Sequence, residues 1–312
     1  MPSHWTIPPH DAGIRLDKFL AGPDRLGSRR RALEALERGK VFLNEVEATV
    51  SQAAIRLAEG DVVRLWIDRP GSAKRPASAV RVAGDLRIIH EDDDLIVVDK
   101  PAGLLAVPLE RRSEASSVYV LLEDHLRSSR RRPFVVHRID RDTSGLVLFA
   151  KNPRAQQLLR SQFKRREPER VYLAVVYGHP SPPQGTWRDR LVWDTKALIQ
   201  KETHPTDARG ADAISEYRVI ERFAASSLIE VRLQTGKRNQ IRLQARLRGH
   251  TLVGEERYVY GPDALRPIAF ERQALHAHRL GFQHPSDQRP LRFESPLPAD
   301  LTNLLDRLRR HI

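Results

Sequence analysis

Two amphipathic patterns, each followed by apolar alternation, open the chain. The apolar residues of IRLDKFL (14–20) are spaced so that they share one face of a short helix. A second helix is predicted from Ser28, a good N-cap residue, to Gly39, which suits the position after the last turn. Two strands are then predicted, at KVFLNEVEA (40–48) and GDVVRLWI (60–67). The pattern indicates a compact module of two helices followed by strands.

The same patterns divide the chain into domains. The compact module is predicted to occupy residues 14–67, behind an N-terminal tail of residues 1–13. Residues 68–85 are rich in Pro, Gly, Ser and Ala and have no apolar period, so they are predicted to be a linker. Residues 86–312 are long enough to form a second, larger domain with a core of its own.

Strands outnumber helices in this second domain. It begins with two apolar strands that flank an acidic turn at 91–94 and run into a Lys-Pro-Ala-Gly loop. The elements that follow are a strand at 144–151, a helix near 153–165, a strand at 170–178, two strands within 214–233 and a helix around 238–248. Several strands are joined by short turns, which predicts an α+β fold with a mixed, largely antiparallel sheet.

The charge balance predicts a polyanionic partner. The chain has 53 Lys and Arg against 40 Asp and Glu, a formal net charge of +13 with a pI near 10.4. A composition biased towards Arg throughout a proteome is one explanation, but the basic residues gather in clusters, as expected of a surface that follows a nucleic acid backbone. The clusters are Arg29–Arg31, Arg127 with Arg130–Arg132, Lys164–Arg166, and Lys237, Arg238, Arg242, Arg246 and Arg248.

Other classes of protein lose support. The chain has no cysteine, which excludes disulfides and Cys-ligated zinc and fits a cytoplasmic protein. No apolar run approaches the roughly 18–20 residues of a membrane span, and the N-terminal residues lack the basic start and apolar stretch of a signal peptide. Walker, G-x-G-x-x-G and H-E-x-x-H motifs are absent as well. We therefore expect a protein without a membrane partner, and a monomer by default.

The segment HRIDRDTSGLVLFAK (137–151) concentrates ionisable groups immediately before a predicted buried strand. Asp140 lies on the loop that enters this strand, a common location for catalytic side chains. Arg242, in the helix around 238–248, could pair with Asp140 bidentately and favour the ionised carboxylate. Tyr172 alternates with Leu and Val in the middle of a strand. Each residue alone has an ordinary explanation as a turn former, a solvated cation or a core aromatic.

Together these residues belong to a pattern that resembles the RluA-type family of RNA pseudouridine synthases. HRIDRDTSG followed by apolar residues and Lys151 matches the family's central signature, and EDDDLIVVDKPAGLLAVP matches its opening stretch. RVYLAVVYG, LQTGKRNQIRLQ and RQALHAHRLGFQHP follow in the family's order, so the resemblance covers about residues 84–298. Residues 14–66 resemble the α-L RNA-binding module that often precedes this catalytic domain.

The resemblance implies an activity and a set of roles. The family converts uridine within RNA to pseudouridine, without metal or cofactor, after the base has left its helix. Asp140 is implied to be the nucleophile, Arg242 the residue that holds it ionised and aimed, and Tyr172 the residue that stacks on the uracil and takes part in removing the proton from C5. Arg138 is implied to fill the space that the base vacates. RNA contacts are assigned to Arg29, Arg30, Arg31, Lys237 and Arg238, and support of the motif to His137, Thr143, Ser144, Gly145 and Lys151.

The chain departs from the family pattern at three positions. Asn239 and Gln244 stand where the family has histidines, and Glu255 replaces the usual aspartate after a glycine. None of the three is Asp140, Tyr172 or Arg242, so we expect these changes to leave the catalytic set untouched and to affect substrate choice or local packing.

Several alternatives stay open at this stage. The favoured substrate is ribosomal RNA of the large subunit, with transfer RNA as the second choice. A non-catalytic RNA-binding factor for ribosome assembly is a competing function, and a glycosidase that uses Asp140 and Asp142 would need two suitably separated carboxylates. His276 and His278 form an H-x-H pair, but structural hydrogen bonds are expected of them and no metal site is predicted. The sequence does not name the uridine, and it does not separate a glycal route from addition to the base.

Overall fold

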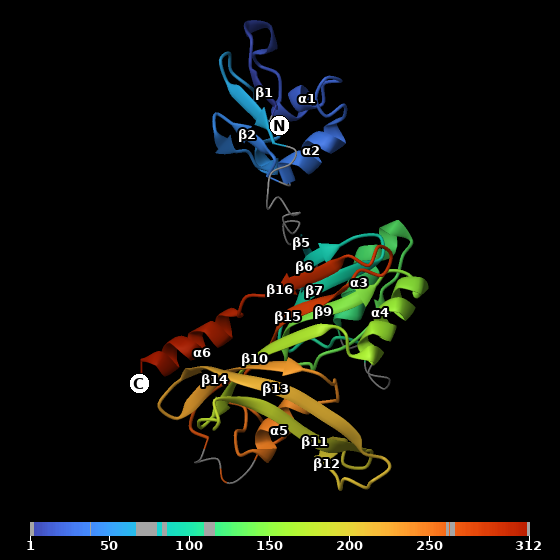
Figure 1. Cartoon of the computed structure of the whole chain (residues 1–312), viewed down its shortest axis with the longest axis vertical. Helices are drawn as coiled ribbons and strands as arrows, with labels where there is room; N and C mark the ends of the chain where they lie inside the picture. Colours follow the sequence, from blue (N-terminus) through green and yellow to red (C-terminus); the bar gives the residue numbers. More distant parts are fainter. Residues whose placement is uncertain are drawn as a thin grey trace. The chain divides into compact units, whose positions relative to one another are not determined.

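The computed structural model describes residues 3–37, 39–66, 80–82, 86–108, 116–259, 262 and 266–310. The chain divides into two compact units, Met1–Ala79 and Val80–Ile312, and each is described by itself (Figure 1). Most of the predicted linker at 68–85 lies outside the described residues. Its residues Val80–Val82 form strand β5, which pairs with β6 in the larger unit, so for these residues the linker prediction is wrong.

The N-terminal unit packs two helices on a four-stranded sheet of order β1-β4-β2-β3. Its elements are β1 (Ser3–Thr6), η1 (Pro9–Asp11), α1 (Leu16–Leu20), α2 (Arg29–Glu37), β2 (Val41–Leu43), β3 (Val46–Glu47), η2 (Val50–Gln52) and β4 (Val62–Leu65). Ser28 caps α2 as predicted, because its Oγ accepts a hydrogen bond from the backbone N–H of Arg31 at 3.3 Å. The core is formed mainly by Leu16, Phe19, Leu20, Leu36 and Val63.

The prediction that residues 1–13 form a tail is wrong. β1 pairs antiparallel with β4, from Ser3 opposite Leu65 to Thr6 opposite Val62. Ile7, which follows this strand, is 1% exposed in the core. The pattern was missed because β1 is short and mostly exposed, so it has no apolar alternation of its own.

The larger unit is built on one mixed sheet. Its path runs β12-β11-β13-β14-β10-β15-β9-β7-β6-β5, with β16 paired to β15 and β8 to β9. The strands are β6 (Leu86–Glu91), β7 (Leu95–Lys100), β8 (Phe134–Val135), β9 (Ser144–Ala150), β10 (Glu169–Tyr177), β11 (Gln184–Asp194), β12 (Ile199–Glu202), β13 (Ala211–Arg222), β14 (Ser226–Leu233), β15 (Leu275–Gln283) and β16 (Pro290–Glu294). The predicted α+β fold and the hairpin around the acidic turn are confirmed.

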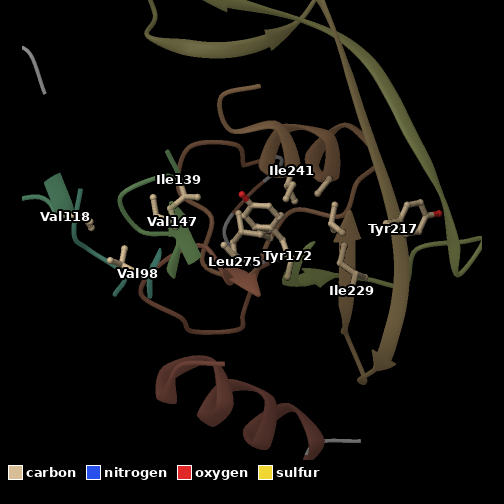
Figure 2. Close-up of a cluster of buried hydrophobic side chains, with 14 of the residues drawn as sticks. Val98, Val118, Ile139, Val147, Tyr172, Tyr217, Ile229, Ile241 and Leu275 are labelled. Carbon is tan, nitrogen blue, oxygen red and sulfur yellow. The ribbon is translucent and has the colours of Figure 1, made fainter. Parts of the chain in front are cut away.

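Helices cover this sheet. They are α3 (Val118–Leu126), η3 (Arg127–Ser129), α4 (Pro153–Arg165), α5 (Gln240–Leu247) and α6 (Ala299–Arg309). The two that the sequence predicted, near 153–165 and around 238–248, are present as α4 and α5, whereas α3 and α6 were not predicted. Asn152 caps α4, since its side chain accepts from the N–H of Ala155. The main apolar core joins strands from both halves of the sheet to α3 and α5 (Figure 2). Within the described residues, the model contains no helix with both the length and the apolar character needed to cross a membrane.

The single parallel pairing among the described strands lies at the signature motif. Ser144 and Gly145, at the start of β9, pair in parallel with His276 and Ala277 of β15, while the other ladders are antiparallel. Gly145 has φ +108°, and a Cβ at this position would lie 2.3 Å from the carbonyl oxygen of Ala277. Only glycine permits this approach of two backbones, so Gly145 fixes the start of β9 against β15, where the loop that carries Asp140 ends.

Candidate active site

A buried lysine holds the loop that carries Asp140 in place. Lys100, at the end of β7, is fully buried and its Nζ donates to the carbonyl oxygens of Pro101, Leu104 and Arg141 at 2.7–2.9 Å. The backbone N–H of Gly103 also donates to the Arg141 carbonyl, at 3.0 Å. The residue next to Asp140 is therefore fixed by charge-assisted and backbone hydrogen bonds, which orients the aspartate side chain.

Asp140 receives two donors on the same oxygen. Nη1 of Arg242 lies 3.3 Å from Oδ2 of Asp140, and Nδ2 of Asn239 lies 2.6 Å from that oxygen. The Asp140 side chain is 28% exposed. Among the residues that the structure describes, none donates a hydrogen bond to Oδ1. One carboxylate oxygen is thus anchored and the other is open.

The predicted bidentate pairing of Arg242 with Asp140 is wrong, because the fork of Arg242 faces Glu255. Nε and Nη2 of Arg242 each lie 2.6 Å from a carboxylate oxygen of Glu255, whose side chain is fully buried. Burial alone would lower the pKa of Arg242, but its hydrogen bonds and charge pairing with Glu255 raise that pKa above the ordinary value. The guanidinium is a fixed cation that gives Asp140 only its remaining Nη1.

Two of the three departures from the family pattern therefore contact the predicted catalytic set, Asp140, Tyr172 and Arg242. Asn239 donates to Asp140 and Glu255 binds Arg242, so the expectation that these replacements leave the set untouched is wrong. Gln244 lies elsewhere: it is fully buried, accepts from Ser215 and donates to Asp189 and to the backbone of β13. Its position in packing agrees with the expectation for that residue.

Tyr172 lies beside this carboxylate. A register shift between Val171 and Tyr172 interrupts the pairing of β10 with β15. Irregularities of this kind change the direction of side chains and are common next to active sites. Figure 2 shows the Tyr172 ring among Ile139, Ile241 and Leu275. Burial raises the pKa of Tyr172 to about 12, so the phenol is neutral near pH 7.

A cavity of about 370 Å³ opens in front of Asp140 and Tyr172. Asp140 is the one acidic residue among the described residues that line it, whereas five basic residues line it: Arg138, Arg170, Lys237, Arg238 and Arg242. The Arg238 guanidinium lies 3.9 Å above the ring of Trp193 from β11, which fixes this cation at the rim. A cationic cavity with a single carboxylate fits a polyanionic substrate.

Comparisons with known proteins agree with this geometry. A family model described as RNA pseudouridylate synthase matches residues 94–247. The chain is 34% identical over 301 residues to an uncharacterized RNA pseudouridine synthase of Bacillus subtilis, covering 95% of each chain. It is 36% identical to the ribosomal large subunit pseudouridine synthase D of Zymomonas mobilis, covering 95% of this chain and 94% of that one. The chain belongs to the RluA-type family of RNA pseudouridine synthases.

A solved structure agrees at the level of the fold. The human RNA pseudouridylate synthase domain containing 4 aligns with a TM-score of 0.58 at 20% identity, over 71% of this chain and 92% of that one. The α+β catalytic fold expected of an RluA-type synthase is therefore present, and the chain is an RNA pseudouridine synthase of the isomerase class.

The other signature residues of this synthase hold the loop in place, and two of them, His137 and Thr143, also line the cavity. His137 stacks on Phe163, with ring centroids 4.8 Å apart, and its Nε2 accepts from the N–H of Leu148. Ser144 Oγ lies 3.0 Å from Nδ1 of His276, and Thr143 Oγ1 accepts from Gln273 at 3.4 Å. Lys151 is buried and paired with Glu91 at 2.5 Å. None of the described residues forms a cluster suited to a metal ion.

The three arginines assigned to RNA in the N-terminal unit differ from one another. Arg29 has a structural partner, because its Nη2 lies 2.7 Å from the buried carboxylate of Asp17. Arg30 lies 3.6 Å from Glu34 and is 88% exposed, and Arg31 is exposed as well. Cations in the first turn of a helix oppose the helix dipole. The ion pair with Asp17 accounts for Arg29 at this position without a contact to RNA.

Sequence reasoning missed two residues of the synthase site. Arg170 lines the cavity two residues before Tyr172, is 8% exposed, and among the described residues its Nε has no hydrogen-bond partner. Its Nη1 would lie 2.5 Å from a Cβ at position 236, so Gly236 leaves the room for this guanidinium. Lys100 is the other, and the Lys-Pro-Ala-Gly stretch was its only signal. The signal for Arg170 was its place as the first residue of the RVYLAVVYG motif, two positions before Tyr172.

Proposed function

We propose that this synthase isomerises a specific uridine in ribosomal RNA of the large subunit, with Asp140 as the nucleophile. The observation that carries the proposal is the open Oδ1 of Asp140 in a cavity whose described lining holds five Lys and Arg residues and no second carboxylate. Support for the substrate comes from relatives that are called ribosomal large subunit pseudouridine synthase D at 34–36% identity over nearly the full chain. Such a substrate also places the enzyme in the cytoplasm.

Base flipping would bring the uridine to Asp140. A base has to leave its stack to enter a cavity of this kind, at a cost of a few kcal/mol. Arg138 is exposed at the rim beside Asp140, so it is placed to occupy the space that the base leaves. Lys237 and Arg238 would hold the flanking phosphates, which compensates for the lost stacking without reading the sequence.

The chemistry exchanges one bond for another. In the addition route, Oδ1 of Asp140 bonds to the base, the N1–C1′ bond breaks, and the uracil turns within the cavity. In the glycal route, Asp140 takes the C2′ proton of the sugar as the N1–C1′ bond breaks. The C5–C1′ bond then forms and the C5 proton leaves. N1 gains a proton, and the bond to Asp140 breaks or the proton returns to C2′, so substrate and product have the same atoms and the carboxylate is regenerated. Arg242 keeps Oδ2 in place throughout, because Glu255 fixes its guanidinium.

Tyr172 would contribute its ring face in this scheme. As a neutral phenol near pH 7 it stacks on the uracil without adding a charge to the cavity. A phenol that still holds its proton is a poor base, so we assign removal of the C5 proton to the Asp140 carboxylate once the intermediate has released it. This assignment differs from the role that the family resemblance implied for Tyr172.

Nucleoside analysis tests the proposed substrate. The full chain is incubated with uridine-labelled transcripts of large-subunit ribosomal RNA, small-subunit ribosomal RNA and transfer RNA, and each RNA is digested and scored for pseudouridine. We expect conversion at one or a few positions of the large-subunit transcript. Conversion of transfer RNA alone would overturn the substrate. Tight binding without conversion of any of these RNAs would favour the assembly factor.

A further inference from the structure

A directed chain of hydrogen bonds ends on the anchored oxygen of Asp140. The backbone N–H of Gln200 in β12 donates to Oη of Tyr258 at 3.1 Å. The Tyr258 hydroxyl donates to Oδ1 of Asn239 at 3.2 Å, and Nδ2 of Asn239 donates to Oδ2 of Asp140 at 2.6 Å. Three elements far apart in the sequence thus converge on one carboxylate oxygen.

The chemistry at both ends fixes the direction of this chain. A main-chain amide can only donate, so the Tyr258 oxygen accepts from Gln200 and its own proton is free for Asn239. An ionised carboxylate can only accept, so Asn239 has to present its NH₂ group to Asp140. With both ends fixed, the amide of Asn239 has one satisfied orientation, and it is a donor to Asp140.

Tyr258 also supports the second donor to Asp140. Its backbone N–H donates to Oε1 of Glu255 at 3.1 Å, and that same oxygen binds Nη2 of Arg242. The Arg242 guanidinium lies 5.4 Å from the centre of the Tyr258 ring. Both groups that hold Oδ2 therefore depend on the segment 255–258, whose tyrosine is 3% exposed.

The backbone of Asn239 points to the same role. Asn239 is the N-cap residue of α5, where an asparagine side chain normally accepts from the first turn of the helix. Here it makes no capping hydrogen bond, and its backbone has φ +52°, in the left-handed region. The residue holds an unusual conformation and leaves the helix end without its side chain, and what it gains is the contact with Asp140.

We propose that Asn239 and Tyr258 are positioning residues that aim the open oxygen of Asp140, with Tyr258 acting through Asn239. The inference rests on the proposed role of Asp140 and adds two residues that the sequence did not assign. Because Asn239 carries no charge and does not titrate, it can orient the nucleophile without changing the number of protons at the site.

Steady-state kinetics on a converted RNA test the proposal. Asn239→Ala should lower kcat about 10- to 100-fold and leave KM for RNA within about 3-fold, because the lost donor aims the nucleophile rather than holding the RNA. Tyr258→Phe, which removes one oxygen from a buried ring, should lower kcat about 3- to 10-fold. Tyr177→Phe is the matched control, since among the described residues its hydroxyl bonds to the backbone of Ile268 alone, and it should keep wild-type kcat.

The double variant separates positioning from a general loss of packing. If Tyr258 acts through Asn239, the double variant Asn239→Ala with Tyr258→Phe should have the kcat of Asn239→Ala alone. Losses that multiply, or wild-type kcat in both single variants, would overturn the inference. Loss of conversion by the wild-type chain on every RNA would instead refute the proposed function, so the two failures are distinct.

Asn239→Asp supplies a readout that packing would not move. A carboxyl at this position would face Oδ2 of Asp140 across about one hydrogen bond, and two such groups share one proton. Among the described residues, Arg242, Lys100, Tyr172 and Tyr258 interact electrostatically with Asp140, and Arg138, Arg170, Lys237 and Arg238 line the same cavity. All of them are kept in the variant. Its kcat should therefore rise as pH falls from about 8 to 6, relative to wild type. A profile parallel to that of wild type would overturn the inference.

Discussion

Two aspartates, one in each unit, bind arginine with opposite results. Asp17 is 1% exposed, and both of its oxygens are occupied: Arg15 spans them at 3.0 Å each and Arg29 adds a contact at 2.7 Å. Asp140 is 28% exposed and has both donors on Oδ2. The presence of an arginine thus does not distinguish the proposed nucleophile from a structural carboxylate. What distinguishes them is whether an oxygen is left open.

The arginines that bind these two aspartates differ in the opposite direction: those of the buried aspartate are exposed, and that of the partly exposed aspartate is buried. Arg15 and Arg29 are 42% and 61% exposed and give their charge to a buried aspartate, and the hydrogen bond from Arg15 lowers the pKa of Asp17 to about 2. Arg242 is 10% exposed, and its fork is satisfied by Glu255. In the larger unit, Glu255 neutralises the charge of Arg242, and Arg242 donates one remaining N–H to Asp140. Asp140 is therefore not enclosed in a bidentate ion pair with its arginine.

Replacement by asparagine should lower turnover at one of these aspartates and stability at the other. Asp140→Asn should lower turnover by at least about 1,000-fold with a free energy of unfolding within about 1 kcal/mol of wild type, because the attacking oxygen is lost and little packing changes. Asp17→Asn should keep turnover and lower the free energy of unfolding by about 2 kcal/mol, through loss of charge-assisted hydrogen bonds. Pseudouridine formation and urea unfolding measure both. Normal turnover by Asp140→Asn would remove it as the nucleophile.

Two glycines with positive φ, one in each unit, differ in how closely other backbone atoms approach them. Gly145→Ala should destabilise the catalytic unit by about 4 kcal/mol or more, because the new Cβ would meet backbone atoms of Ala277 at 2.3 Å. Gly60→Ala, in the N-terminal unit, should cost only about 1 kcal/mol, since φ is +84° but nothing lies within 4 Å. Urea unfolding compares them, and equal costs would mean that the approach of β9 and β15 is not tight.

The elements were predictable because their signals are local. The helices at 153–165 and 240–247 and the hairpin between β6 and β7 follow from apolar spacing, caps and turn residues within a few positions. Asp140, Tyr172 and Arg242 were found through the order of motifs, and the structure brings Asp140 and Arg242 into contact. β1 was missed because its partner, β4, is nearly sixty residues away and its own side chains are mostly exposed.

The details of the site were not predictable, for a related reason. Arg242 has two carboxylates within reach, and only the folded chain decides that its fork faces Glu255. Asn239 was noted only as a departure from the family pattern, yet its side chain bonds to Asp140, 99 positions earlier in the sequence. Choices among competing partners depend on the distances between elements, and spacing along the chain contains no information on these distances.

Mild acid should affect the catalytic unit first. Burial lowers the pKa of His276 to about 4, so the fold holds it neutral while the unfolded chain, near 6.5, binds a proton. The stability of this unit should therefore fall as pH drops below 6.5, by about 2 kcal/mol at pH 5 from His276 alone. The stability that Asp17 gives the N-terminal unit is complete above about pH 3.8 and is lost only as pH falls towards 2.

Hydrogen exchange of the full chain in dilute urea, corrected for intrinsic rates, reads the two units separately. Between pH 7 and pH 5, peptides from β9 and β15 should lose protection while peptides from β4 keep theirs. His276→Gln should reduce this difference, because the position no longer titrates. Equal loss of protection in both units would contradict the assignment of the acid sensitivity to His276.

The smallest effect concerns arginines that differ in their partners. Arg30→Gln and Arg31→Gln should each weaken binding of the converted RNA about 2- to 5-fold near 0.15 M salt and reduce the slope of log K against log salt by about 1, if each side chain contacts one phosphate. Neither should change the free energy of unfolding by more than about 0.5 kcal/mol, because both side chains are exposed. Arg29→Gln should differ by lowering stability as well, since Arg29 also binds Asp17. An unchanged salt slope in all three variants would mean that this helix faces away from RNA, and the cationic side chains around Asp140 would then have to account for the affinity.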